Sequence, residues 1–106
     1  MANEPPTGTF FRSPLATPEM AERLRRALPE FDWGLGDSDR YRTYYVRGTR
    51  ADGLRLKIEP EDEPDEYYLG VHFGRMTPFP DAGWQLATAR ELHAQVLSLL
   101  EGVARR

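Results

Sequence analysis

Two histidines, His72 and His93, are the side chains of this 106-residue chain that titrate near neutral pH when unperturbed. His72 follows Tyr68 by four residues, and it could serve as a general acid or base. No nucleophile motif, phosphate-binding glycine loop or zinc-spaced cluster accompanies it. The sequence therefore predicts a protein that is not an enzyme, and an enzyme using His72 for acid–base chemistry is an alternative.

Three aspartates between residues 30 and 40, Asp32, Asp37 and Asp39, raise the question of a cation site, because calcium takes several oxygen ligands. The twelve-residue calcium loop also needs a glycine at its sixth position and a glutamate at its twelfth. Counted from Asp32, those positions hold Asp37 and Thr43. Turn-forming aspartates explain the segment better, so we expect no metal and no cofactor.

Three segments read as β-strands, Tyr41–Gly48, Leu54–Glu59 and Tyr67–Phe73. Apolar residues take every second position in the last two, which is typical of strands with one buried face. The predicted core residues there are Leu54, Leu56, Ile58, Leu69, Val71 and Phe73. The first segment is ambiguous, and Tyr44 and Val46 are assigned inward because the opposite choice would bury Arg47. A slip of one residue would reverse that assignment.

The other face of the predicted sheet then carries a mixture of aromatic and basic side chains. These candidate binding residues are Tyr41, Tyr45, Arg47, Arg55, Lys57, Tyr68 and His72. Tyrosine and arginine are enriched where protein interfaces gain most of their energy, so we expect a protein partner or a second copy of the chain. Such residues also occur on solvated sheet faces, where cross-strand pairs only stabilise the sheet.

Single-stranded nucleic acid is an alternative ligand, because bases stack on aromatic rings while arginines contact phosphates. The formal net charge of −3 and a dense acidic loop make that alternative less favourable. The loop residues are Glu59, Glu61, Asp62, Glu63, Asp65 and Glu66. The loop could steer a basic partner or bind a cation, although an acidic run with prolines is usually a mobile, solvated turn.

Helices are predicted on both sides of the strands. Thr17 as cap and Pro18 at the first helical position start one that ends before Pro29. The second has a capping box at Thr88 and Glu91, with a possible earlier start at Asp81 or Ala82, and runs to about Gly102. Its apolar stripe is Leu92, Val96, Leu99, Leu100 and Val103. Residues 30–40 read as a connection.

Residues 1–16 are expected to form a flexible arm, with an extra edge strand possible at Thr9–Arg12. At least one of Phe10 and Phe11 should dock on the domain, because leaving both in water is costly. Residues 17–106 form the predicted domain. It is a two-layer α+β fold of order α-β-β-β-α, a three-stranded antiparallel meander with both helices packed on one face.

No apolar run reaches the length of a membrane-spanning helix, and the N-terminus lacks the basic start and apolar core of a secretory signal. The chain has no cysteine, so disulfides and thiolate chemistry are excluded. We therefore expect a small non-enzymatic cytoplasmic domain that acts through protein–protein contacts, by partner binding or homodimerisation, at an open sheet face or an exposed sheet edge.

Overall fold

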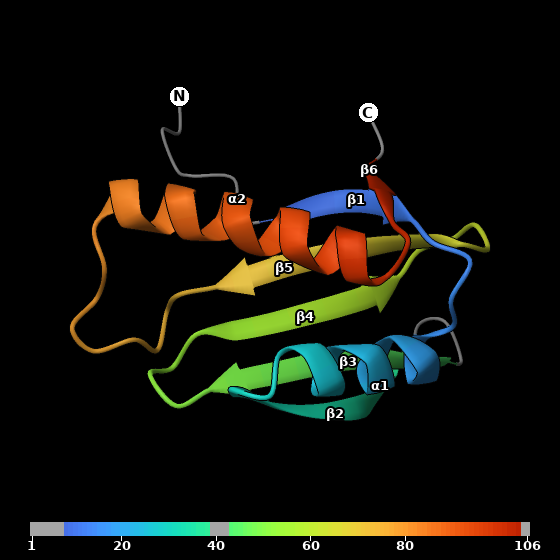
Figure 1. Cartoon of the computed structure of the whole chain (residues 1–106), viewed down its shortest axis with the longest axis horizontal. Coiled ribbons are helices and arrows are strands. Elements are labelled where there is room, and N and C mark those ends of the chain that lie inside the picture. Colours follow the sequence, from blue (N-terminus) through green and yellow to red (C-terminus); the bar gives the residue numbers. More distant parts are fainter. Residues whose placement is uncertain (1–7, 39–42, 105–106) are drawn as a thin grey trace.

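The computed structural model describes residues 8–38 and 43–104, and Figure 1 shows how their helices and strands are arranged. In chain order the elements are β1 (Gly8–Arg12), α1 (Thr17–Ala27), β2 (Phe31–Ser38), β3 (Thr43–Arg50), β4 (Arg55–Pro60), β5 (Glu66–His72), α2 (Ala82–Leu99) and β6 (Val103–Ala104). The chain thus forms one α+β domain. None of the helices in this described part is long and apolar enough to cross a membrane.

The described strands form one antiparallel sheet in the order β2-β3-β4-β5-β1-β6. The three predicted strands correspond to β3, β4 and β5, and they pair in the predicted antiparallel order. The predicted order α-β-β-β-α and the three-stranded meander are nevertheless only partly correct. Consecutive strands from β2 to β5 make a four-stranded meander, and β1 and β6 extend the sheet beyond β5.

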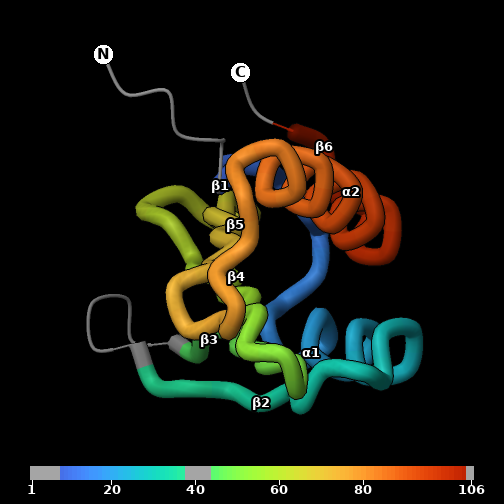
Figure 2. Tube along the Cα trace, turned by 90° about the vertical axis from the view of Figure 1, so that its left-hand side faces the viewer, coloured from blue at the N-terminus to red at the C-terminus, as the bar shows by residue number. Residues whose placement is uncertain are grey.

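Both helices lie on the same side of the sheet, as Figure 2 shows, so the predicted two-layer arrangement is confirmed. One hydrophobic core fills the space between the layers, and Met20 and Leu24 of α1 and Val96 of α2 are fully buried in it. All six core residues predicted from β4, β5 and their flanks are buried. The opposite face of the sheet has no described helix over it.

Strand β2 replaces the connection that was predicted for residues 30–40. Glycine and aspartate are depleted in strands, which is why the segment read as a loop. Its alternate residues nevertheless face the core: Phe31 is buried, and Trp33 and Leu35 pack against the core. The Trp33 indole lies over Gly48 of β3, and its Nε1 donates a hydrogen bond of 2.8 Å to the Leu28 carbonyl.

Strand β1 pairs with β5 and β6 and is therefore an interior strand, whereas the possible strand at Thr9–Arg12 was expected at an edge. Phe11 is fully buried and stacks on Tyr67, while Phe10 points to the other face and is 44% exposed. The arm expected over residues 1–16 thus contains ordered residues from Gly8 onward. Residues 1–7 lie outside the described part of the chain.

The helix ends differ from the predicted ones. Ala16 is the N-terminal cap of α1, and Thr17 is already the first helical residue. Helix α2 takes the earlier start, because Asp81 caps it by accepting a 2.8 Å hydrogen bond from the Trp84 backbone nitrogen. The predicted capping box is wrong, since Thr88 lies inside the helix.

The apolar stripe predicted for the last helix is confirmed only in part. Leu92, Val96 and Leu100 are buried, and Leu99 packs against the core while partly exposed. Val103 is 70% exposed. It belongs to β6, because the helix ends at Leu99 and the chain then turns onto the edge of the sheet.

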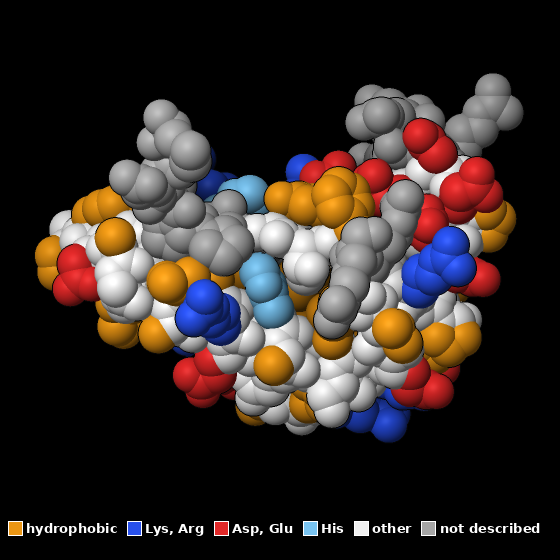
Figure 3. Space-filling model, turned by 90° about the horizontal axis from the view of Figure 1, so that it is seen from above, with side chains coloured by type: hydrophobic (Ala, Val, Ile, Leu, Met, Phe, Trp, Pro, Cys, Tyr) orange, Lys and Arg blue, Asp and Glu red, His pale blue; other side chains and the backbone are white. Residues whose placement is uncertain are grey.

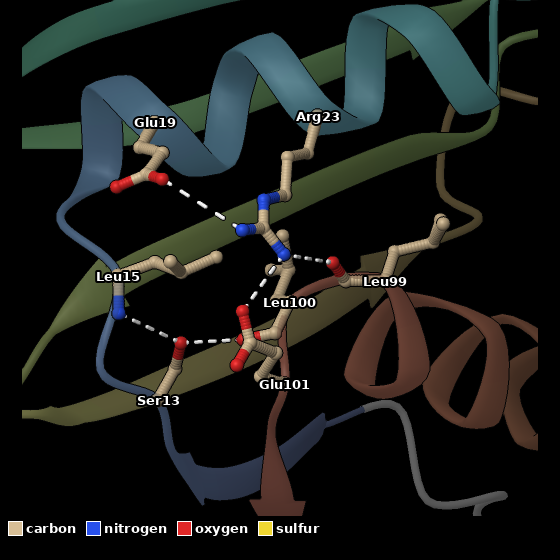
Figure 4. A network of polar contacts seen from close by, with 7 residues as sticks. All are labelled: Ser13, Leu15, Glu19, Arg23, Leu99, Leu100 and Glu101. Carbon is tan, nitrogen blue, oxygen red and sulfur yellow. Dashed lines mark hydrogen bonds and ion pairs between the residues drawn. The ribbon is translucent and has the colours of Figure 1, made fainter.

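A network of polar contacts ties the segment before α1 to the segment after α2 (Figure 4). The buried Ser13 hydroxyl donates to the Leu100 carbonyl at 2.6 Å and accepts from the Leu15 backbone nitrogen at 3.1 Å. Arg23 of α1 donates to the Leu99 carbonyl at 3.3 Å and forms an ion pair with Glu101 at 3.0 Å. These contacts satisfy backbone groups that the end of α2 leaves without helical partners.

Replacing Ser13 by alanine should lower the free energy of unfolding by about 1–3 kcal/mol, because the buried Leu100 carbonyl loses its hydrogen-bond donor. Urea unfolding monitored by circular dichroism measures the loss. Ser98→Ala, at an exposed position of α2, is the control and should change stability by less than about 0.5 kcal/mol. Equal effects of the two substitutions would contradict a structural role for Ser13.

Candidate binding face

The candidate site lies on the face of the sheet opposite the two helices. Cross-strand pairing places Arg47 of β3 opposite Lys57 of β4, and Arg55 of β4 opposite His72 of β5. The assignment of Val46 to the core is correct, since it is fully buried. Tyr44 was also assigned inward, but it is 47% exposed, because it lies near the start of β3 beyond the edge of the core.

A hollow of about 370 Å³ opens on this face. Its lining comes from Tyr45, Arg47, Gly48, Thr49, Arg55, Leu56, Lys57 and His72. It thus brings together five of the seven residues predicted as binding residues. We call these five candidate side chains, Tyr45, Arg47, Arg55, Lys57 and His72, the basic hollow.

Of the two remaining predicted residues, the structure describes Tyr68. Tyr68 faces the same side of the sheet, but its ring packs against Phe10 of β1, with ring centroids 4.8 Å apart. Tyr41 lies outside the described residues. Phe10 is a residue of this face that sequence reasoning missed, because β1 was treated as part of an arm. The signal was present, since two adjacent phenylalanines in a strand must point to opposite faces.

Glycines on this face let the large side chains of neighbouring strands lie close to the backbone. A Cβ atom at Gly36 would overlap the Tyr45 ring, and one at Gly8 would overlap the Tyr68 ring. The Arg47 guanidinium lies over Gly34, where a Cβ would be 3.5 Å from its Nη2. The rings and the guanidinium group therefore lie close to the backbone of the neighbouring strand and leave this face open.

Two of the three cations of the basic hollow have no acidic partner among the residues that the structure describes. Lys57 lies 3.5 Å from Glu59, and its ammonium also sits 4.6 Å from the centroid of the Tyr45 ring. Arg47 and Arg55 form no ion pair with any residue that the structure describes, and the Arg55 Nε is buried without a hydrogen-bond acceptor there. Five other arginines do have acidic partners: Arg12, Arg23, Arg25, Arg26 and Arg50. This part of the face therefore favours an anionic ligand group.

His72 is held in its neutral form by these surroundings. Partial burial lowers the pKa of His72 below its usual 6.5, and the nearby charges of Arg55 and Lys57 lower it further. Glu59 opposes the shift by favouring the imidazolium. His72 is thus mainly a neutral hydrogen-bonding group at pH 7. An anion bound beside it would favour its protonation.

We expect the imidazole of His72 to titrate below pH 6.5 in an NMR titration, and Arg55→Gln to raise that midpoint, because it removes a neighbouring positive charge. Glu59→Gln should lower the midpoint and serves as the control of opposite sign. The folded state binds this proton more weakly than the unfolded chain does. The contribution of His72 to the free energy of unfolding should therefore fall as the pH drops below about 6.5. A midpoint at or above 6.5 would contradict the description of the hollow as cationic.

The acidic loop predicted between Glu59 and Glu66 is shorter in the structure, because Glu59 belongs to β4 and Glu66 to β5. Glu66 is buried and forms an ion pair with Arg12 at 3.2 Å. Residues 61–65, which we call the acidic turn, keep Asp62, Glu63 and Asp65 exposed. Figure 3 shows acidic side chains gathered at one end of the molecule, the end at which the turn between β4 and β5 lies in Figure 1.

The acidic turn has a defined backbone. The Glu61 nitrogen donates to the Glu66 carbonyl at 2.9 Å, and the Glu66 nitrogen donates to the Glu63 carbonyl at 3.2 Å. A further bond of 2.9 Å runs from the Ser13 nitrogen to the Asp65 carbonyl. Asp65 has a φ of 69°, in the left-handed region. The turn therefore has backbone hydrogen bonds of its own, and its side chains Asp62, Glu63 and Asp65 are exposed to solvent.

Within the described ranges 8–38 and 43–104, no three histidine or acidic side chains are placed so that they could hold a metal ion. Comparison of the chain with protein-family models, with curated proteins and with solved structures found no match. The residues of the binding face are therefore the basis on which a function can be argued.

Proposed function

We propose that this chain is a non-enzymatic binding domain that docks a protein partner on the open face of its sheet. The observation that carries the proposal is the basic hollow, in which Arg47 and Arg55 have no acidic partner within the described chain. The guanidinium group offers a planar set of donors that matches a carboxylate. A partner that brings carboxylates would satisfy donors that the described domain leaves without acidic partners.

The surroundings of the two arginines also favour a protein partner. Tyr45 adds a large, partly exposed ring at the wall of the hollow, and Phe10 and Tyr68 form an aromatic pair on the same face. Aromatic and arginine side chains contribute most of the energy at many protein interfaces. The combination provides both apolar contact area and charge complementarity.

Site-specific crosslinking tests the proposal. A photoreactive benzoyl-phenylalanine placed at Thr49, an exposed residue that lines the hollow, should crosslink to a protein in cells. The adduct should disappear when Arg47→Glu and Arg55→Glu are added. The same probe at Gln95, exposed on α2 and away from the hollow, should give no such adduct. An adduct at Thr49 that survives the charge reversal would overturn the proposal.

Single-stranded nucleic acid is the second candidate, and the rings lying low over Gly36 and Gly8 are the observation that favours it. Stacked bases need such accessible aromatic faces beside cations. Against it, the Lys57 ammonium occupies one face of the Tyr45 ring, and the acidic turn would repel phosphates. Fluorescence anisotropy with single-stranded oligo(dT) tests this candidate. Binding that weakens with salt and is lost in the double variant Tyr45→Ala plus Arg55→Ala would favour it.

A further inference from the structure

We infer that the partner is a second copy of this chain, whose acidic turn enters the basic hollow of the first. The inference rests on the proposed function and names the occupant of the same face. Its basis is that the chain carries both halves of a complementary contact, the basic hollow and the acidic turn, and that a single copy cannot bring them together.

The two surfaces are complementary in charge. The hollow contributes Arg47, Arg55 and Lys57, and the turn contributes Glu61, Asp62, Glu63 and Asp65. In the described part of the chain none of these four acidic residues forms an ion pair, whereas Lys57 of the hollow pairs with Glu59. Arg47 and Arg55 on one surface and the four carboxylates on the other thus have no ion-pair partner among the described residues, and opposite charges on two copies attract each other.

A single copy cannot use this complementarity because both surfaces are attached to the same strand. Arg55 and Lys57 lie in β4, and the acidic turn begins directly after its last residue, Pro60. At about 3.3 Å per residue, Lys57 and Asp62 are roughly 17 Å apart along the chain. Since β4 is hydrogen-bonded on both sides, to β3 and β5, the turn cannot fold back onto its own hollow.

Two copies can satisfy both surfaces at once. In the dimer that we infer, a two-fold axis runs parallel to the open face and perpendicular to the strands. The open faces of the two copies then lie against each other, and their strands run in opposite directions. The hollow of each copy then faces the acidic turn of the other, so every contact occurs twice and the assembly closes as a dimer. The hollow, with a volume of about 370 Å³, has space for more than one carboxylate group together with water.

The acidic turn is suited to such docking because it is already folded. Its backbone bonds from Glu61 to Glu66 and from Glu66 to Glu63, with Pro60 and Pro64, limit the conformations it can adopt. A segment that is rigid before binding loses less conformational entropy when it binds. The formal net charge of −3 on each copy opposes unspecific association, so the dimer should depend on these local contacts and weaken with salt.

A charge exchange between two variants tests the pairing by sedimentation velocity. The first variant carries Arg47→Glu and Arg55→Glu in the hollow, and the second carries Glu61→Arg and Glu63→Arg in the turn. Each variant alone opposes like charges at both contacts, so its dimer dissociation constant should rise on the order of a hundredfold. An equimolar mixture should restore the dimer, because both contacts of the mixed pair then join opposite charges.

The matched control is the pair Arg75→Glu and Arg90→Glu, which makes the same change in charge at exposed positions outside the hollow and the turn. This variant should dimerise like the unmodified chain. Circular dichroism and thermal melting establish that each variant is folded. Dimers in the mixture, together with monomers of each hollow or turn variant alone, would support the inference.

Other outcomes overturn the inference without ambiguity. An unmodified chain that stays monomeric at all concentrations and at low salt excludes the second copy as partner. A dimer that the mixture fails to restore excludes the pairing of hollow and turn. In both cases an arginine-dependent Thr49 adduct with a different protein, identified by mass spectrometry, would leave the proposed function standing. The absence of any such adduct would remove the proposed function as well.

Discussion

Replacing Phe11 by alanine should lower the free energy of unfolding by about 3–5 kcal/mol, the usual cost of removing a fully buried phenylalanine side chain. Phe11 stacks on Tyr67, with ring centroids 5.6 Å apart. Its ring also lies close to Gly102, where an added Cβ would be 3.0 Å from the Phe11 Cδ2. The residue therefore joins β5 to the segment after α2. Guanidinium unfolding monitored by tryptophan fluorescence measures the loss.

Phe10→Ala is the matched control, because it removes the same side chain one residue earlier on the opposite face of β1. Phe10 is 44% exposed and contacts Tyr68, so the expected loss is about 1 kcal/mol or less. A large loss for Phe10 together with a small one for Phe11 would show that β1 has the opposite register. Similar small losses for both would show that β1 does not belong to the core.

Gly48→Val should destabilise the protein by about 3 kcal/mol, at the upper end of what overpacking a core costs. Gly48 is buried in β3, and a Cβ placed there would overlap the indole of Trp33 on β2. The indole cannot easily move, since its Nε1 is bonded to the Leu28 carbonyl at 2.8 Å. We expect a lower melting temperature and a shifted near-ultraviolet circular dichroism signal from Trp33.

Gly74→Ala provides the comparison for this substitution. Gly74 is exposed, and a Cβ there would meet no other atom within 4 Å. Alanine should be neutral or stabilise by up to about 1 kcal/mol, because it restricts the unfolded chain. If Gly48→Val changed the stability as little as Gly74→Ala, that result would contradict the packing of Trp33 against β3.

The core of the fold was predictable from the sequence, and the extent of the sheet was not. Leu54, Leu56 and Ile58 alternate with charged residues, and that period identifies a strand and its buried face without further information. The glycines of β2 carry no such signal. Gly34 and Gly36 are compatible with a strand only because Arg47 and Tyr45 of β3 lie over them, and that contact exists only after the strands have paired.

Which residues share the candidate face was predictable in part, from the same alternation along the strands. Arg55, Lys57 and His72 share a face because of their spacing along β4 and β5 and the pairing of Arg55 with His72. Sequence spacing could not tell which cations are neutralised, because ion pairs depend on side chains brought together by the fold. Arg12 and Glu66 lie 54 residues apart yet form an ion pair, whereas Arg55 finds no acidic partner in the described chain.

The pairing of β1 with β6 brings the first and last described strands side by side, with Phe11 opposite Ala104. A short linker could therefore join the start of β1 to the end of β6, and the exposed loop around Gly74 could supply new chain ends. Such a circular permutant should keep the same strand order, because no step in the topology requires the chain to begin at β1. We expect a fused protein to be tolerated best before β1 or after β6, where the first and last described strands lie side by side.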